Sequence, residues 1–184
     1  METPGVSGIN GEQKIFPFKK FSPKIAKSVF LAPGVKIIGN VEIGEDSSVW
    51  YNTVIRGDVH YIKIGSFTNI QDCCMLHVTS NKFPLNIGNK VTIGHSVNLH
   101  GCTISDLCLV GIGAIVLDGA LLEERSMVSA GAVVTPGFTV PSGKLVAGVP
   151  AKIIRDLKQT EKNDIENLAS RYIKYSKETI ESLK

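Results

Sequence analysis

An aliphatic residue recurs every six positions through most of this chain, and this period constrains the fold more than any other feature. A small or β-branched residue usually follows the aliphatic residue four positions later. A three-residue slip follows the fifth repeat, an insertion spans about 80–85, and one residue drops out after the eleventh repeat. The repeats begin at Leu31, Ile37, Ile43, Val49, Ile55, Ile64, Ile70, Leu76, Ile87, Ile93, Leu99, Ile104, Val110, Val116, Leu122, Val128, Val134, Val140 and Val146.

This period excludes an amphipathic helix, whose apolar positions recur at intervals of about three and four. It is typical of short strands joined by sharp corners, in which stacked coils bury their aliphatic side chains along one axis. Glycine often follows the aliphatic residue, as at Gly94 and Gly111, where we expect a tight corner to need an unhindered backbone. A sandwich of short strands is the alternative, but its turns usually come about every eight to twelve residues. The sequence therefore predicts an all-β solenoid.

The composition changes near Thr160, where apolar residues take up helical spacing with lysine and glutamate between them. We expect Thr160 or Asn163 to be the N-cap of this helix, because Asn163 has a glutamate three positions later, as in a capping box. The expected organisation is a lead-in segment over 1–30, the solenoid over 31–157, and a C-terminal helix over 158–184 that packs on the flank of the solenoid.

Composition narrows the class of protein. At 184 residues the chain is long enough for one domain with a substantial core. A net charge of +3 without a lysine or arginine run argues against a nucleic-acid partner, and no apolar stretch has the length of a membrane span. Residues 1–30 lack the apolar segment of a signal peptide, so a cytoplasmic protein is expected. The four cysteines lack the spacing of a disulfide scaffold or a zinc-thiolate site, and we expect them to be structural.

The repeat register determines where three of the histidines lie. If three repeats make one coil, the residue after the leading aliphatic of every third repeat falls in one column. Arg56, His77 and His100 share such a column, with neighbours about 4.8 Å apart. Two adjacent imidazoles at this spacing can converge on one ion, at about 2.0–2.1 Å each. The register therefore predicts that His77 and His100 are ligands of one divalent metal.

His95 falls on a different face, in a column with Tyr51 and Asp72, so it should miss the ion held by His77 and His100 of its own chain. A closed ring of heterologous contacts would bring the His95 face of one subunit against the other two histidines of the next. The prediction is a homotrimer with equivalent metal sites at its interfaces, each with an open position for a small substrate. The alternative is that these histidines are surface or interface residues without a metal, as the fourth histidine, outside every column, is expected to be.

Four segments resemble the gamma-class carbonic anhydrases and their hexapeptide-repeat relatives, namely WYNTVIRGDV (50–59), IKIGSFTNIQDCCMLHV (62–78), IGNKVTIGHSVNLHGCTI (87–104) and LVAGVPAKIIRDL (145–157). The NIQD…H…GHxxxLHGC pattern is the specific part, whereas the closing GVPAK run also occurs in hexapeptide acyltransferases. The likeness covers about 30–157. It implies a left-handed parallel β-helix, a hand that departs from the usual right-handed crossover.

The resemblance also implies a ligand set and a reaction. The ligands that match His77 and His100 come from one subunit and the ligand that matches His95 comes from its neighbour, usually around Zn²⁺, with Fe²⁺ or Co²⁺ as other occupants. The implied reaction is the reversible hydration of carbon dioxide to bicarbonate. A neutral three-histidine set leaves a position open for water, which the metal makes a hydroxide nucleophile near neutral pH.

Five further residues have roles implied by the resemblance. Arg56 and Asp72 are implied to pair across the trimer interface, with Asp58 in the same network. An interface ion pair with no part in catalysis is an equal alternative for Arg56 and Asp72. Gln71 matches a side chain that orients the water or bicarbonate, with Asn69 close by, and an amide can do this without adding a charge.

Two features depart from the family pattern. Its best-known members carry an acidic loop whose glutamate shuttles protons, whereas the insertion VTSNKFPLN (78–86) contains no carboxylate. A tyrosine often present in the C-terminal segment is matched here by Ile165. Three functions remain open: a carbonic anhydrase, an acyltransferase with a histidine base, and a non-catalytic metal- or siderophore-binding relative. The three-histidine register favours the first over the second, because a general base needs no further imidazole partners.

Overall fold

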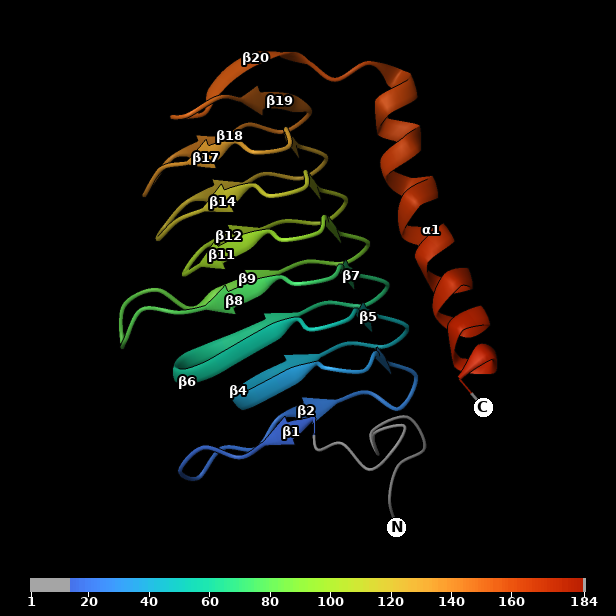
Figure 1. The fold of residues 1–184 in the computed structure, drawn as a ribbon. Helices are drawn as coiled ribbons and strands as arrows, with labels where there is room; N and C mark the ends of the chain where they lie inside the picture. The colour runs from blue at the N-terminus through green and yellow to red at the C-terminus, as the bar shows by residue number, and fades with distance from the viewer. Residues whose placement is uncertain (1–13, 184) are drawn as a thin grey trace.

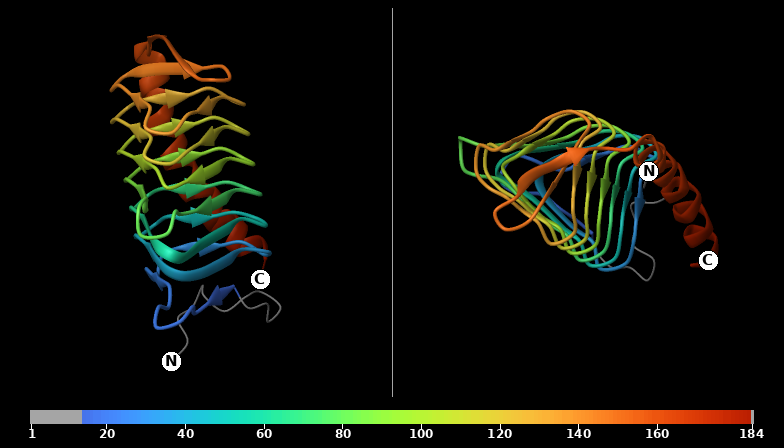
Figure 2. Two further views of the ribbon diagram at one scale, coloured as in Figure 1. Left: turned by 90° about the vertical axis from the view of Figure 1, so that its left-hand side faces the viewer. Right: turned by 90° about the horizontal axis from the view of Figure 1, so that it is seen from above.

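The structure, a computed structural model that describes residues 14–183, is a parallel β-solenoid with one helix, α1 (Gln159–Ser182), beside it (Figure 1). Viewed along the axis of the stack, the coils form a triangle and α1 lies outside it (Figure 2). Successive coils follow one another along the stack in sequence order, from the N-terminal end to the C-terminal end (Figure 1). Helix α1 then runs back along the stack toward the N-terminal coils. The predicted fold class, a parallel β-helix of hexapeptide repeats followed by a C-terminal helix, is confirmed.

Short strands form the three walls of the triangle. The first wall contains β3 (Phe30–Leu31), β5 (Ser48–Val49), β7 (Asn69–Ile70), β10 (Thr92–Ile93), β13 (Leu109–Val110), β16 (Met127–Val128), β19 (Lys144–Ala147) and the antiparallel β20 (Lys152–Asp156). The second wall contains β1 (Ile15–Phe16), β4 (Lys36–Ile43), β6 (Val54–Ile64), β8 (Met75–His77), β11 (Asn98–His100), β14 (Ile115–Val116) and β17 (Val133–Val134). The third wall contains β2 (Lys24–Ile25), the far ends of β4 and β6, β9 (Leu85–Ile87), β12 (Thr103–Ile104), β15 (Leu121–Leu122) and β18 (Thr139–Val140).

Strand register follows the repeat arithmetic of the sequence. Ile55 pairs with Leu76, Leu76 with Leu99, and Leu99 with Val116, so three repeats make one coil. These side chains are 0–1% exposed and stack along the axis. Burial of each aliphatic side chain contributes about 1.5–3 kcal/mol. The insertion adds residues only between β8 and β9, so it leaves the register of the later coils unchanged.

The glycines that follow the aliphatic positions lie against the backbone of the next coil. Neither Gly94 nor Gly111 has a positive φ, and the left-handed corner conformation is adopted by residues such as Arg125 (φ 58). A Cβ atom on Gly94 would lie 2.8 Å from the backbone nitrogen of Ile112, and one on Gly111 would lie 2.4 Å from that of Ala130. The backbone therefore has to be unhindered at these positions, as expected, and the reason is that the glycines allow successive coils to approach closely.

The cysteines are all free, and three of them fill gaps in the solenoid core. Burial raises the pKa of Cys74 and of Cys102 to about 12. Burial also raises the pKa of Cys108, whereas Cys73 is exposed. The buried thiols therefore stay protonated at neutral pH and act as small apolar fillers, in keeping with the structural role expected for them.

The N-cap of α1 lies earlier in the chain than predicted. Its N-cap is Lys158, whose backbone N–H donates to the Glu161 carboxylate at 2.8 Å. Arg155, at the end of β20, donates to both oxygens of Glu161 and anchors this first turn. The expected N-caps Thr160 and Asn163 were therefore wrong, since both lie inside the helix.

The helix packs on the first wall, where it contacts β5 and β10. Ile165 and Ala169 are buried on its inner face, and Arg125 pairs with Glu166 at 2.6 Å. Across residues 14–183, no helix combines the length and the apolar character needed to traverse a bilayer.

Candidate metal centre

His77 and His100 lie side by side on the second wall. They are Cα partners in β8 and β11, as the repeat register predicts, and Nδ1 of His77 is 3.1 Å from Nε2 of His100. The alternation of a strand turns both imidazoles outward, because Leu76 and Leu99 point into the core. Their rings are tilted by 60° to each other, with centroids 5.1 Å apart.

A carboxylate holds the other nitrogen of each ring. Nε2 of His77 is 3.0 Å from Oδ1 of Asp58, and Nδ1 of His100 is 2.7 Å from Oδ1 of Asp118. A carboxylate accepts the ring N–H, so in a neutral imidazole the opposite nitrogen carries a lone pair. With both rings neutral and both outer N–H groups on the carboxylates, the two lone pairs would point into the space between the rings.

This donor set fits a divalent cation. Nδ1 of His77 and Nε2 of His100 lie 3.1 Å apart, a separation that a shared proton or a shared cation between the two nitrogens would satisfy. Two nitrogens bound to a tetrahedral Zn²⁺ at about 2.0–2.1 Å stand about 3.3 Å apart, close to the observed separation. Within residues 14–183, a single chain gathers no group of three or more possible metal ligands around one point.

Both carboxylates are held in their ionised form. Burial raises the pKa of Asp58, but hydrogen bonds from His77 and Arg56 outweigh this effect and hold its pKa below the ordinary value. Burial likewise raises the pKa of Asp118, but hydrogen bonds from His100 and Thr79 hold it below the ordinary value. Ionised carboxylates accept hydrogen bonds only, which keeps the ring N–H on the side away from the shared space.

Asp118 was missed in the sequence reasoning, although a signal for it exists. Gly119 donates its backbone N–H to the carbonyl of Gly101 at 2.8 Å, so the corner after β14 stacks on the corner after β11. One coil beyond His100, the column position itself is Leu117, and Asp118 is the residue that follows it at the corner.

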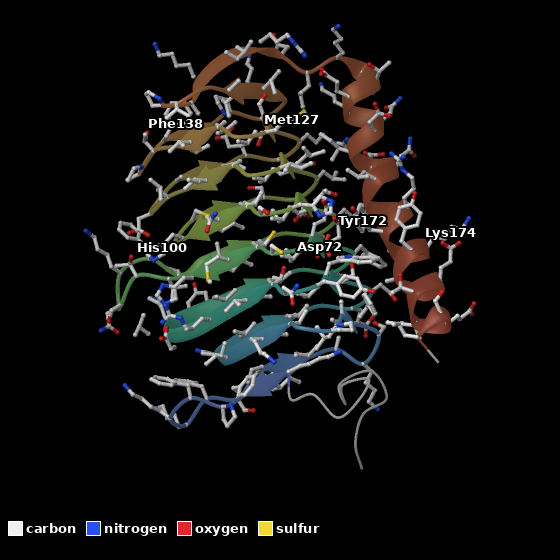
Figure 3. The ribbon with its side chains drawn as sticks, viewed as in Figure 1. Asp72, His100, Met127, Phe138, Tyr172 and Lys174 are labelled. Carbon is white, nitrogen blue, oxygen red and sulfur yellow. The ribbon has the colours of Figure 1, made fainter. Side chains whose placement is uncertain are left out.

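His95 belongs to a separate cluster on the first wall. Its Nδ1 lies 2.6 Å from Oδ2 of Asp72, and the backbone N–H of Tyr51 donates to Oδ1 of Asp72 at 3.1 Å. The predicted column of these three residues is therefore present. Figure 3 shows Asp72 on the side of the solenoid next to α1 and His100 on the opposite side. With Nδ1 on the carboxylate, the half-exposed His95 presents Nε2 outward and away from the histidine pair of its own chain.

The implied ion pair between Arg56 and Asp72 is not formed within one chain. Arg56 donates to Asp58 and Asp72 pairs with His95, so a contact between Arg56 and Asp72 across an interface stays a prediction.

Asn69 and Gln71 form a buried amide pair at the end of β7. Asn69 donates to the Thr92 hydroxyl at 2.9 Å and to the Val91 carbonyl at 3.4 Å. Nε2 of Gln71 donates to Oδ1 of Asn69 at 3.2 Å. This bond fixes the Gln71 amide and leaves its carbonyl oxygen as an acceptor.

A cavity of about 570 Å³ lies between α1 and the first wall, next to His95. One residue in its lining, Tyr172, was not among the predicted site residues. Tyr172 and Asp72, which are labelled in Figure 3, line it together with Trp50 and His95. The ring of Tyr172 packs edge-on against Trp50, with centroids 5.4 Å apart. Burial raises the pKa of Tyr172, and the nearby charge of Asp72 adds to the rise. Ile165, the residue matched to the family tyrosine, is instead buried on the inner face of α1.

Comparisons with known proteins agree with this architecture. Residues 22–57 match the family model described as bacterial transferase hexapeptide (six repeats). The chain is 44% identical to gamma carbonic anhydrase 2, mitochondrial, of Arabidopsis thaliana over 83% of its own length, and it spans only 56% of that relative. It is 42% identical to the carbonic anhydrase of Geobacillus kaustophilus, over 86% of this chain and 87% of the relative. The crystal structure of a hexapeptide transferase family protein from Anaplasma phagocytophilum superposes with a TM-score of 0.86 at 43% identity, over 89% of this chain and 96% of that one.

Proposed function

Because this chain belongs to the gamma carbonic anhydrase family, we propose that it interconverts carbon dioxide and bicarbonate at divalent metal sites shared between the subunits of a homotrimer. The observation that carries the proposal is the pair of imidazoles His77 and His100, each with an aspartate on one nitrogen and with the two other nitrogens facing each other at 3.1 Å. Each chain supplies this pair on one wall and His95 on another, so a complete ligand set takes residues from two chains.

In the proposed site, Nδ1 of His77, Nε2 of His100 and Nε2 of His95 of the partner subunit hold the metal. All three rings have their remaining nitrogen on a carboxylate, and all three are then neutral donors. Imidazole donors of this kind suit Zn²⁺, and they also suit Fe²⁺ and Co²⁺. When bound, the metal supplies Lewis-acid chemistry that makes water a nucleophile near neutral pH.

The surrounding side chains position the reactants. The Gln71 carbonyl oxygen, fixed through the amide bond to Asn69, accepts a hydrogen bond from the attacking water and turns its lone pair toward the carbon of carbon dioxide. Arg56 holds Asp58, which in turn holds His77. The water oxygen forms a bond to the carbon of carbon dioxide as one C=O π bond opens onto its oxygen, and an O–H bond of the water breaks to release one proton, which has to leave the site before the next turnover.

The direct test is metal analysis of the purified protein together with stopped-flow hydration of carbon dioxide, for wild type and for His95→Ala. The proposal expects metal and hydratase activity in wild type and the loss of both in the variant. Tightly held metal without hydration at any pH would instead indicate a non-catalytic metal-binding protein. Absence of metal combined with turnover of acyl-coenzyme A would indicate an acyltransferase.

A further inference from the structure

We infer that the insertion over 78–86 is a positioning device for the metal ligand His100, which it controls through Thr79 and Asp118. This inference rests on the proposed function, because it assigns a role toward the same metal. The insertion carries no carboxylate of its own. It contributes a hydroxyl group that fixes the carboxylate behind His100.

The contacts form a continuous chain of hydrogen bonds from the insertion to the imidazole. Oγ1 of Thr79 donates to Oδ2 of Asp118 at 2.8 Å, and Oδ1 of Asp118 accepts from Nδ1 of His100 at 2.7 Å. Both oxygens of Asp118 are therefore engaged, which prevents the carboxylate from rotating away from the ring. Thr79 itself is fixed, because its backbone N–H donates to the carbonyl of Phe83 at 3.0 Å and closes the insertion on itself.

Two glycines, Gly101 and Gly119, leave space for the side chains of Asp118 and Phe83. A Cβ atom on Gly101 would lie 2.3 Å from Oδ1 of Asp118 and 2.7 Å from Cβ of Phe83. A Cβ atom on Gly119 would lie 3.0 Å from the Phe83 ring. The two glycines next to His100 and Asp118 thus make space for the carboxylate and for the aromatic anchor of the insertion. Phe83 packs there and holds Thr79 beside Asp118.

The chemical consequence is a choice of tautomer. An ionised Asp118 accepts the Nδ1–H of His100, which places the lone pair of His100 on Nε2, facing His77. Without this acceptor, the other tautomer would place an N–H where the metal has to bind. The two ligands of one chain therefore have different supports: Asp58 is held by Arg56 two residues away on the same strand, whereas Asp118 is held by the insertion.

The test measures Co²⁺ affinity by visible absorption, in competition with a chelator, for Asp118→Asn, Thr79→Val and Thr79→Ser. Loss of a carboxylate behind a metal-bound histidine typically costs about 10–100-fold in affinity, which is the loss expected for Asp118→Asn. Thr79→Val keeps the shape but loses the hydroxyl, and we expect a smaller loss of up to about 10-fold. Thr79→Ser keeps the hydroxyl and should bind as wild type does. Thr139→Val, on an exposed position of β18, is the matched control.

The tautomer of His100 gives a second readout that needs no metal. In ¹⁵N NMR spectra of the metal-free protein, His100 of wild type should carry its proton on Nδ1, and Thr79→Val and Asp118→Asn should populate the Nε2–H form. Wild-type affinity and an unchanged tautomer in both variants would overturn the inference. If wild type itself binds no Co²⁺, the proposed function fails, and the tautomer shift in the metal-free variants still decides whether the insertion positions His100.

Discussion

Nδ1 of His77 and Nε2 of His100 face each other at 3.1 Å, and each ring is held from behind by an aspartate. Because these two nitrogens already face one point, neither imidazole would have to turn to bind a metal in the proposed site. The fold supplies this arrangement at low cost, because both histidines occupy the same repeat position on successive coils and the aliphatic residues before them are fully buried. Stability and site geometry therefore depend on the same repeat.

Truncation of the core beneath the histidines should destabilise the protein. Leu99 is 1% exposed, and Leu99→Ala is expected to lower the free energy of unfolding by about 2–5 kcal/mol through lost burial and a residual cavity. Ile154→Ala, at a position 55% exposed on β20, should change it by no more than about 0.5 kcal/mol. Urea unfolding followed by circular dichroism measures both. Equal effects of the two substitutions would contradict the stacked aliphatic core.

The start of α1 should be sensitive to acid. Hydrogen bonds from Arg155 and from the Lys158 backbone lower the pKa of Glu161 to about 2, from an ordinary value of 4.5. A lowered pKa stabilises the folded state above about pH 4.5, and this contribution is lost as the pH falls toward 2. Between pH 5 and 2, the unfolding temperature of wild type should therefore fall more steeply than that of Glu161→Gln. Glu181→Gln, on the exposed last turn of the helix, should follow the wild-type profile, and a wild-type profile for Glu161→Gln would argue against the anchored first turn.

Hydration should depend on added buffer. The insertion over 78–86 contains no carboxylate to relay the proton that the reaction releases, so protons have to leave to small bases in solution. In stopped-flow measurements at constant pH and ionic strength, kcat is expected to rise with the concentration of an imidazole buffer, while kcat/KM stays constant. A kcat that is independent of buffer would show that another group in the protein carries the proton.

The sequence predicted those parts of the structure that the repeat controls. The neighbouring positions of His77 and His100, and the column that holds Asp72 and His95, follow from the length of one coil once the insertion between the repeats is recognised, because the chain then stacks one coil directly on the next. The fold class follows from the same argument. The reason for the glycines did not, since the period does not reveal how closely successive backbones approach.

Contacts that the insertion and α1 make with the solenoid were not predicted. Thr79 and Asp118 are 39 positions apart and meet only because the insertion closes on itself, which has no periodic signature. Tyr172 faces the cavity because burial of Ile165 and Ala169 sets the rotation of α1, and a helical pattern does not specify which residues reach a neighbouring wall. The N-cap was misplaced for a similar reason, since Glu161 is anchored by Arg155 from outside the helix.

Subunit complementation tests the shared metal site most directly. Two variants are refolded separately, His95→Ala and His100→Ala. Neither should bind Zn²⁺, because every interface between subunits then lacks one ligand. When the two variants are refolded together, they form mixed trimers. In each mixed trimer, one interface joins the intact His77 and His100 of one chain to the intact His95 of the other. The expectation for a metal site shared between subunits is that Zn²⁺ binding, measured by metal analysis after dialysis, returns only in the mixture. A mixture that binds no more Zn²⁺ than the separate variants, when wild type refolded in the same way binds one ion per chain, would contradict it.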